Sequence, residues 1–391
     1  MTLKRNQFQW SSFVLAGVMI IAGPEAAACN IFVDGALGED VLATGGAGDP
    51  FKTIQRGADE ALTPGDIVCV RPGVYFENNQ DAPTPSFKGV KVRASGAPGN
   101  PIVFQPDPAV PGAVIIDMQF DVTLSPGSGT AVTDALGFYI RAFDDITIRG
   151  FEIRNVTTGI LTQVLNSPNA VTGFYDPPER IVMENNHIHD VRRDQRETNV
   201  DTNIAAIRPN DCYDCVIRGN RLHGVSLITT RDVTNSNHDY EIANFEVIDD
   251  PAGDDIVIET PINQNSAGIH SFGMLRTVIE NNEIFDAAVG IFQKSWTNQP
   301  LPGDLDYPGI VPPAINTATD FGLRVKRNLI HDTALGVRLS PSGGSGRIVS
   351  GSGKAHGNPA HYNAEISENI FYSTQVATGA NHRLGPRFER M

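Results

Sequence analysis

Six segments of the chain share one short pattern, and this repeat restricts the fold more than any other feature. Each segment has a short alternating apolar strand, a two-residue polar corner and a second short strand. The segments are ITIRGFEI at 146, IVMENNHI at 181, CVIRGNRL at 215, TVIENNEI at 277, LRVKRNLI at 323 and AEISENIF at 364. Copies that cannot bury their apolar faces alone must stack, so the pattern predicts a solenoid made of β-strands.

The second corner residue is an asparagine in all but the first segment, where Phe151 takes its place. Asparagine tolerates left-handed or bridging backbone angles at a sharp bend, and its side-chain amide can bond to the next copy. We therefore expect a stack formed by Asn186, Asn220, Asn282, Asn328 and Asn369.

A third strand follows the second one in most copies. These strands are GFYIRAF at 137, GILTQ at 159, AAIRPN at 205, GIHSFG at 268, GIFQKS at 290 and GVRLSPSGG at 336. Three strands per coil predict an all-β fold, a right-handed parallel β-helix. Long insertions at about 225–266 and 295–322 are expected to leave the coils at corners, where solenoids carry binding loops.

The stretch before the repeats carries its own motifs. They are Pro50-Phe51-Lys52-Thr53-Ile54-Gln55, then Pro64-Gly65-Asp66, then Arg71-Pro72-Gly73-Val74-Tyr75. This order closely resembles the opening of secreted right-handed β-helix proteins of the pectate-lyase-like superfamily. The resemblance implies an N-terminal cap over about 29–80, in which an amphipathic helix from about 51 to 62 covers the open end of the solenoid. The superfamily holds lyases, hydrolases, epimerases and binding proteins, so the resemblance implies a fold and no single activity.

Residues 1–28 have the features of a secretory signal peptide, because Lys4 and Arg5 precede an apolar run over 13–23. The run is shorter than the about 20 residues of a membrane span. We expect one mature domain over 29–391, monomeric, without a transmembrane segment, and secreted or periplasmic; a lipid-anchored Cys29 is the alternative. Four cysteines are too few for a disulfide framework, but Cys212 and Cys215 could form a local disulfide.

The charge balance directs attention to a basic patch. With 30 Lys and Arg against 45 Asp and Glu, the net charge is −15, which argues against nucleic acid and anionic membranes as partners. If the aliphatic residue of each third strand points inward, the next residue and the one two further on point outward. These outward residues are Tyr139 with Arg141, Leu161 with Gln163, Arg208 with Asn210, His270 with Phe272, Phe292 with Lys294, and Arg338 with Ser340, and none is acidic.

This row predicts a groove that binds an acidic polysaccharide. Arginine can hold a uronate carboxylate with two parallel hydrogen bonds, and aromatic rings can pack on sugars. The candidate binding residues are Arg208, His270, Phe292, Tyr139, Arg141 and Asn210. The segment GIFQKS, followed one coil later by GVRLS, is similar to the chondroitinase B and alginate lyase family. That similarity implies β-elimination with Lys294 as base and Arg338 as its partner; a lyase in which Lys294 acts alone stays open.

Three other functions remain as alternatives. Glycoside hydrolysis needs two opposed carboxyl groups, which the outward positions do not supply. Uronate C5-epimerisation is suggested by GFYDPPE at 173–179, which resembles a mannuronan epimerase motif through Tyr175 and Asp176, with Pro178 in place of the catalytic histidine. Outside enzymes, a non-catalytic glycan-binding or surface β-helix is the main alternative.

Metal binding is suggested at one corner. Asp190, Asp286 and Asp332 each end a second repeat strand, so they are expected to stack beside the basic row, either as a calcium site or as a capping ladder. The nearby His187, His189 and His331 also suggest zinc. We expect alternating histidines to point to opposite faces of a strand, which argues against a shared ion.

Overall fold

The structure is a computed structural model that describes residues 28–77, 87–118, 134–163, 177–194, 204–230, 242–248, 256–261, 266–272, 274, 276–294, 322–340 and 365–372. The predicted signal peptide and the 295–322 insertion lie almost entirely outside these ranges, as do Tyr175 and Asp176. Within the described ranges, no helix is long and apolar enough to span a membrane.

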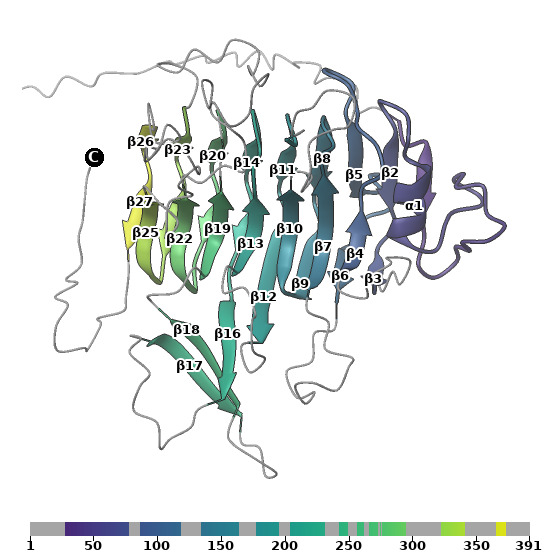
Figure 1. Cartoon of the computed structure of the whole chain (residues 1–391). Helices are drawn as coiled ribbons and strands as arrows, with labels where there is room; N and C mark the ends of the chain where they lie inside the picture. The colour runs from purple at the N-terminus through teal and green to yellow at the C-terminus, as the bar shows by residue number, and fades with distance from the viewer. Residues whose placement is uncertain are drawn as a thin grey trace, which may run out of the picture.

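Three long sheets run side by side along the molecule (Figure 1). Sheet I consists of β1 (Ile31–Val33), β2 (Ile67–Val70), β5 (Ile102–Pro106), β8 (Ile146–Arg149), β11 (Val182–Glu184), β14 (Val216–Arg218), β20 (Val278–Glu280), β23 (Arg324–Lys326) and β26 (Glu365–Ser367). Sheet II contains β3 (Gly73–Tyr75), β6 (Val114–Asp117), β9 (Glu152–Val156), β12 (His187–Asp194), β15 (Arg221–Leu222), β21 (Glu283–Ile284), β24 (Leu329–His331) and β27 (Ile370–Tyr372). Sheet III consists of β4 (Phe87–Lys91), β7 (Asp134–Arg141), β10 (Thr158–Gln163), β13 (Ile204–Pro209), β19 (Ser266–Phe272), β22 (Ala287–Lys294) and β25 (Thr333–Ser340).

The chain visits the sheets in the order I, II, III and then begins the next coil. Thus β8, β9 and β10 form one coil, and β11, β12 and β13 form the next, with parallel pairing between them. The predicted fold, a parallel β-helix with three strands per coil, is confirmed. The fold implied by the likeness to pectate-lyase-like proteins is confirmed with it.

The predicted inward phase of the third strands is also confirmed. Ile160, Ile207, Ile269 and Ile291 are fully buried in one apolar cluster that fills the coils. The small residue before each of them has a steric reason. A Cβ at Gly290 would lie 2.5 Å from Ile330 Cγ2 and 2.6 Å from the carbonyl oxygen of Gly336, so a side chain does not fit there.

The asparagines form the expected stack at the corner between sheets I and II. The backbone N–H and Nδ2 of each donate to Oδ1 of the asparagine on the next coil, at 2.9–3.1 Å, from Asn186 through Asn220, Asn282 and Asn328 to Asn369. The left-handed angle lies one residue earlier than expected, for example at Asn185 (φ 56°) and Asn281 (φ 56°). The ladder asparagine is therefore retained for its amide, and its neighbour makes the bend.

A short helix lies at the N-terminal end of the stack, as the resemblance implies (Figure 1). It is α1 (Ile54–Glu60), shorter than the predicted 51–62, and it packs against β1, β2 and β4, the first strands of sheets I and III. Thr53 caps it by accepting from the N–H of Arg56. The buried carboxylate of Glu77 accepts from the N–H groups of Ile54 and Gln55 at 2.8 and 3.1 Å.

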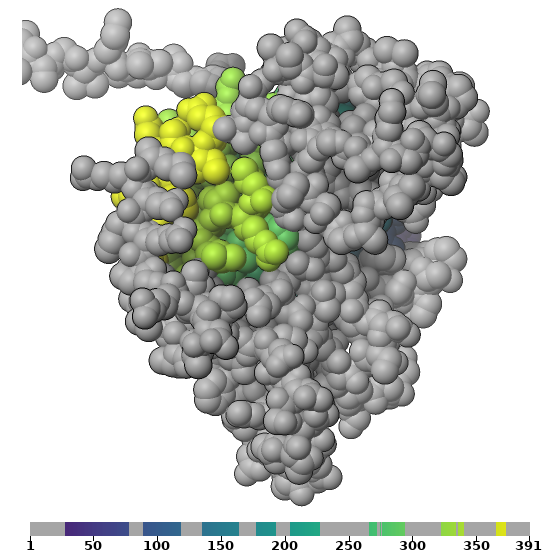
Figure 2. All heavy atoms as spheres, turned by 60° about the vertical axis from the view of Figure 1, so that its left-hand side comes forward, coloured from purple at the N-terminus to yellow at the C-terminus, as the bar shows by residue number. Residues whose placement is uncertain are grey.

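The 225–266 insertion is not only a loop. It contains β16 (Val225–Thr230), β17 (Ile242–Ile248) and β18 (Ile256–Pro261). β16 pairs in parallel with β12, and β18 and β17 follow it in antiparallel order, so the insertion extends sheet II away from the stack (Figure 1). At the C-terminal end, residues of the last coils lie at the surface (Figure 2), where Ile370 and Tyr372 of β27 are 61% and 44% exposed.

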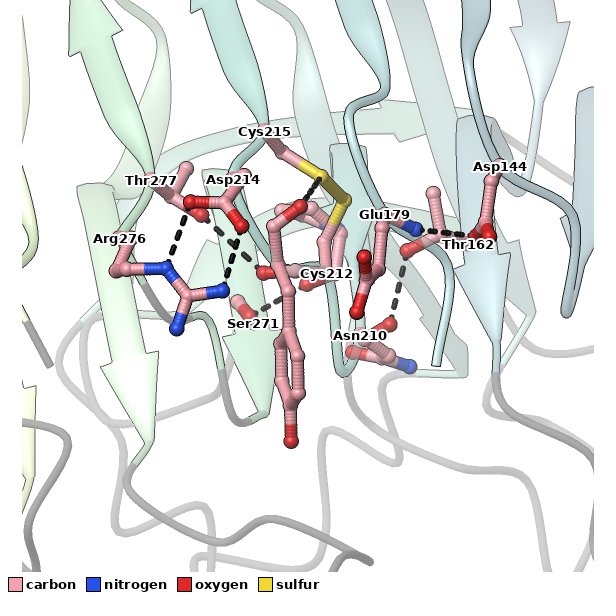
Figure 3. The surroundings of a disulfide bond; sticks show 12 residues. Asp144, Thr162, Glu179, Asn210, Cys212, Asp214, Cys215, Ser271, Arg276 and Thr277 are labelled. Atoms are coloured by element: carbon pink, nitrogen blue, oxygen red, sulfur yellow. Dashed lines mark hydrogen bonds and ion pairs between the residues drawn. A yellow bond between two sulfur atoms is a disulfide. The ribbon is translucent and has the colours of Figure 1, made fainter. Parts of the chain in front are cut away.

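All four cysteines are in disulfides. Cys212 and Cys215 are bonded, as suggested, in the turn between β13 and β14 (Figure 3). Thr277 Oγ1 on the next coil donates to the carbonyl of Cys212 at 3.2 Å. The second disulfide, Cys29–Cys69, was not anticipated, and it ties the first described residues to β2. Because the sulfur of Cys29 is bonded to Cys69, the lipid-anchored alternative is contradicted.

Candidate functional site

The predicted outward row lies in register across sheet III. Leu161 pairs with Tyr139 and with Arg208, Ile207 beside Arg208 pairs with Ile269 beside His270, and Phe292 pairs with His270 and with Arg338. These residues therefore lie side by side on successive strands. Lys91 of β4, which the sequence analysis missed, extends the row because it pairs with Tyr139. In order along the stack, the row is Lys91, Tyr139, Leu161, Arg208, His270, Phe292 and Arg338.

The second predicted row lies at the strand ends. Arg141 pairs with Gln163, and Lys294, the last residue of β22, pairs with Phe272 and Ser340. Lys294 and Arg338 thus occupy consecutive coils, as the family similarity implies. Asn210 lies just beyond β13, in the turn beside the disulfide (Figure 3), and its carbonyl accepts from Thr162 Oγ1 at 2.9 Å.

The expected exposure of the row is wrong at its centre. His270 and Phe292 are buried, with 0% and 1% exposure, and Tyr139 is 9% exposed. The outer face of sheet III carries apolar residues beside them, since Phe292 packs with Ala267, Val289 and Leu335. A sheet with apolar residues on both faces is buried on both, a pattern that strand alternation alone does not reveal. Arg141, Arg208, Asn210 and Arg338 are only partly buried.

Arg338 and Phe292 form a defined pair within this face. The guanidinium carbon of Arg338 lies 4.6 Å from the ring centroid of Phe292, which is a cation–π contact. The ring centroid of His270 lies 5.0 Å from that of Phe292. The stacking surface of Phe292 that was predicted for a sugar is therefore taken by Arg338. The contact instead holds an arginine in place, one coil from Lys294.

The charge of sheet III differs sharply from that of the whole chain. Within the bounds of its seven strands the one acidic residue is Asp134, at the start of β7. Against it stand six basic residues, Lys88, Lys91, Arg141, Arg208, Lys294 and Arg338. In a chain of net charge −15, the strands of this sheet are thus basic in composition, which is the local charge that a site for an anionic ligand needs.

The corner aspartates occupy equivalent places between sheets II and III. Asp190, Asp286 and Asp332 all have left-handed backbone angles, with φ of 52°, 50° and 49°. Gly224 takes this place on the coil between Asp190 and Asp286, so those two are separated by about 10 Å, twice the strand spacing. One ion cannot contact all three. The carboxylates of Asp190 and Asp332 contact the neighbouring histidines, His189 and His331, at 2.8 and 2.9 Å.

The expectation for the histidines of β12 is wrong. His187 and His189 lie on the same face of the strand, with ring centroids 4.5 Å apart, because residues two apart in a strand share a face. His189 belongs to a column of stacked rings on the outer face of sheet II, and the ring of His187 lies beside that column. One ring from each of five coils forms this column, in the order His189, His223, Phe285, His331 and Tyr372.

Electrostatics differ from ring to ring in this column. Burial, with the nearby His189, His187 and Arg221, lowers the pKa of His223 to about 4. Burial also lowers the pKa of His187. The pKa of His189 is raised, chiefly by its hydrogen bond to Asp190. At neutral pH, His187 and His223 are therefore neutral imidazoles.

The comparisons with known proteins come from solved structures. No protein-family model matches the chain, and no curated protein is detectably similar to it. XylC, solved with xylose, has a TM-score of 0.41 and 13% identity, covering 80% of this chain and 64% of its own. A rhamnogalacturonan lyase has a TM-score of 0.38 and 14% sequence identity, and the match covers 88% of this chain and 73% of the lyase. Pectate lyase Pel9A has a TM-score of 0.32 and 12% sequence identity, and the match covers 93% of this chain and 94% of Pel9A. The chain thus spans less than two thirds of the length of XylC.

Proposed function

We propose that this protein is a secreted or periplasmic carbohydrate-active enzyme that cleaves a uronate-containing polysaccharide by β-elimination at the outer face of sheet III. The observation that supports it most is the concentration of six basic residues and one acidic residue in the strands of that sheet. Its two disulfides suit an oxidising compartment outside the cytoplasm.

The proposed chemistry divides between binding and proton transfer. Arg338, one coil from Lys294, binds the carboxylate of the uronate that reacts, so that the proton on C5 becomes acidic. Arg208 and Arg141 lie three and five strands away from Arg338 in sheet III and bind carboxylates of other sugars of the polymer. Lys294 removes that proton. The released electron pair forms the C4–C5 double bond, and the glycosidic oxygen leaves with the electrons of the broken C4–O bond and is protonated. Neighbouring cations favour the neutral form of a lysine, which the base must have.

The test is the ultraviolet absorbance of an unsaturated uronate, followed with alginate, pectate and chondroitin as substrates, with and without calcium. We expect Lys294→Ala to abolish turnover, and Arg338→Ala to reduce it strongly. Lys326→Ala is the matched control, because Lys326 lies on sheet I beside Glu280, away from the proposed site. Equal turnover in Lys294→Ala and Lys326→Ala would contradict the assignment of the base.

A second candidate function is glycan binding without catalysis. The burial of His270 and Phe292 favours it, because a polymer laid on this face meets Arg208 and Arg338 on either side of the buried centre of the predicted row. In this case no polymer would give an increase in ultraviolet absorbance. Binding would remain measurable and would weaken by similar amounts in Arg141→Ala, Arg208→Ala and Arg338→Ala.

A further inference from the structure

Four side chains of the types that ligate metals, from three consecutive coils, meet on the outer face of sheet II. Glu152 comes from β9, His187 and His189 from β12, and His223 directly follows β15. Each of Glu152, His187 and His189 offers one ligand atom, and these atoms all lie within 4.8 Å of one another. His223 joins them, since its Nε2 lies 2.9 Å from His187 Nε2.

The register of the sheet explains this convergence. Glu152 pairs with His187 across the strands, and the N–H of His223 donates to the carbonyl of Ile188, which places its ring beside His189. The ring centroids of His187, His189 and His223 lie 4.5 to 5.2 Å apart, so the three imidazoles form a triangle. All four side chains are partly exposed, and an ion can reach them from solvent.

The distances suit a small divalent ion. With metal–ligand bonds of about 2.1 Å, two ligands of a tetrahedral ion are about 3.4 Å apart. His189 Nε2 lies 3.4 Å from Glu152 Oε1, and the His187–His223 contact is 2.9 Å. Small ring rotations would convert the second contact, now a hydrogen bond, into two metal bonds.

Neighbouring side chains orient the ligands as in known metal sites. Asp190 Oδ2 lies 2.8 Å from His189 Nδ1, which directs Nε2 of that ring toward Glu152. A carboxylate behind a ligating histidine is the usual partner that fixes its tautomer. Arg154 Nη1 also donates to Glu152 Oε1 at 3.2 Å, and a carboxylate oxygen with two lone pairs can accept this hydrogen bond and still bind an ion.

We propose that Glu152, His187, His189 and His223 bind a divalent metal ion of the zinc class and that the ion links three consecutive coils. Three imidazoles and one carboxylate favour zinc over calcium or magnesium, which prefer oxygen ligands. An ion at this place holds the coils of β9, β12 and β15 together.

The chain contains its own control for this site. Two coils further on, His331 lies 2.9 Å from Asp332 through Nδ1 and 3.5 Å from Glu283 through Nε2, which repeats the arrangement of His189 with Asp190 and Glu152. This second place has no counterparts of His187 and His223. Leu329 pairs with Glu283 where His187 pairs with Glu152, and the rings that flank His331 are Phe285 and Tyr372. His331 therefore tests the effect of losing a stacked histidine without losing a ligand.

The experiment uses the whole mature protein, freed of any histidine tag and treated with chelator, and equilibrium dialysis with zinc chloride. We expect one tightly held zinc ion per chain in the unchanged protein and in His331→Gln, and none in His223→Gln or His189→Gln. Zinc should raise the melting temperature of the first two proteins only, because an ion that binds only the folded state stabilises it. Cobalt(II) gives an independent readout, since a tetrahedral nitrogen and oxygen site produces intense visible absorption bands.

Two results would overturn the proposal. One is the absence of stoichiometric zinc in the unchanged protein. The other is equal loss in His331→Gln and His223→Gln, which would indicate a general effect of the ring column. Circular dichroism of each variant without metal separates lost binding from lost folding, and Glu152→Gln, which leaves the column intact, provides a further ligand variant.

Discussion

Gln293 is an unusual residue in the interior of the coils. It is fully buried on the inner face of sheet III, in register with Ser271 and Leu339, and neither polar atom of its amide has a hydrogen-bond partner in the described part of the chain. Ser271, by contrast, donates to the carbonyl of Pro209 at 2.7 Å. A buried polar group without a partner costs about 1–3 kcal/mol.

Replacing Gln293 with leucine should therefore stabilise the protein. We expect Gln293→Leu to raise the free energy of unfolding by about 1 kcal/mol, since the next coil already accommodates Leu339 at the same place. Urea denaturation followed by circular dichroism measures it. Gln163→Leu is the control and should not stabilise, because Gln163 is partly exposed and accepts from the Tyr139 hydroxyl. An unchanged or lower value for Gln293→Leu would show that the amide is satisfied.

Glu77 makes a pH-dependent contribution at the N-terminal cap. Burial raises its pKa from 4.5 to about 7, against the two backbone N–H bonds that lower it. Between these values the unfolded chain has lost the proton and the folded protein keeps it, so the free energy of unfolding falls as pH rises through this window. Above pH 7 the stability that protonated Glu77 contributes is fully lost. Below pH 4.5 that stability is fully present.

Glu77→Gln removes this dependence. The variant should be less stable than the unchanged protein below pH 4.5, where only a hydrogen bond is altered, and the difference should narrow or reverse as pH rises to about 7. Melting temperatures over that range measure it. A difference that stays constant with pH would mean that Glu77 titrates normally in the folded protein.

At the scale of strands and corners, the asparagine ladder gives the sharpest contrast between neighbouring residues. Asn282 accepts two hydrogen bonds from Asn220 and donates to the carbonyl of Ile217, all buried, whereas Asn281 beside it is exposed with a left-handed backbone. We expect Asn282→Ala to cost about 2–4 kcal/mol, because it leaves several buried groups unpaired. Asn281→Gly should be close to neutral, since glycine accepts that angle. Equal effects in denaturant titrations would contradict this account.

The repeat made the strands, their register and their inward phase predictable. Alternation fixes which side chains share a face, but it does not say what covers the outer face, and so the burial of His270 and Phe292 was missed. The ring column could have been found. Its members stand three residues after the ladder asparagine in every copy, for example His189 after Asn186 and His223 after Asn220. The wrong face assigned to alternate histidines hid this signal.

Across the whole molecule, the two disulfides should differ in their effect on stability. Cys29–Cys69 spans 40 residues and Cys212–Cys215 spans three. Because a crosslink acts largely by restricting the unfolded chain, the long one should contribute about 4 kcal/mol and the short one distinctly less. We expect Cys29→Ser with Cys69→Ser to lower the denaturation midpoint more than Cys212→Ser with Cys215→Ser. The reverse order would show that local geometry at the β13–β14 turn dominates.

The asparagine ladder keeps the coils aligned whatever the length of chain between them. Consecutive members are 34, 62, 46 and 41 residues apart, yet each makes the same pair of hydrogen bonds to the next. The ladder therefore has one asparagine per coil, whatever number of residues the coil contains. A foreign peptide inserted between two coils, even one tens of residues long, would leave the hydrogen bonds between their asparagines unchanged. This makes the protein a scaffold that can display inserted sequences at fixed spacing.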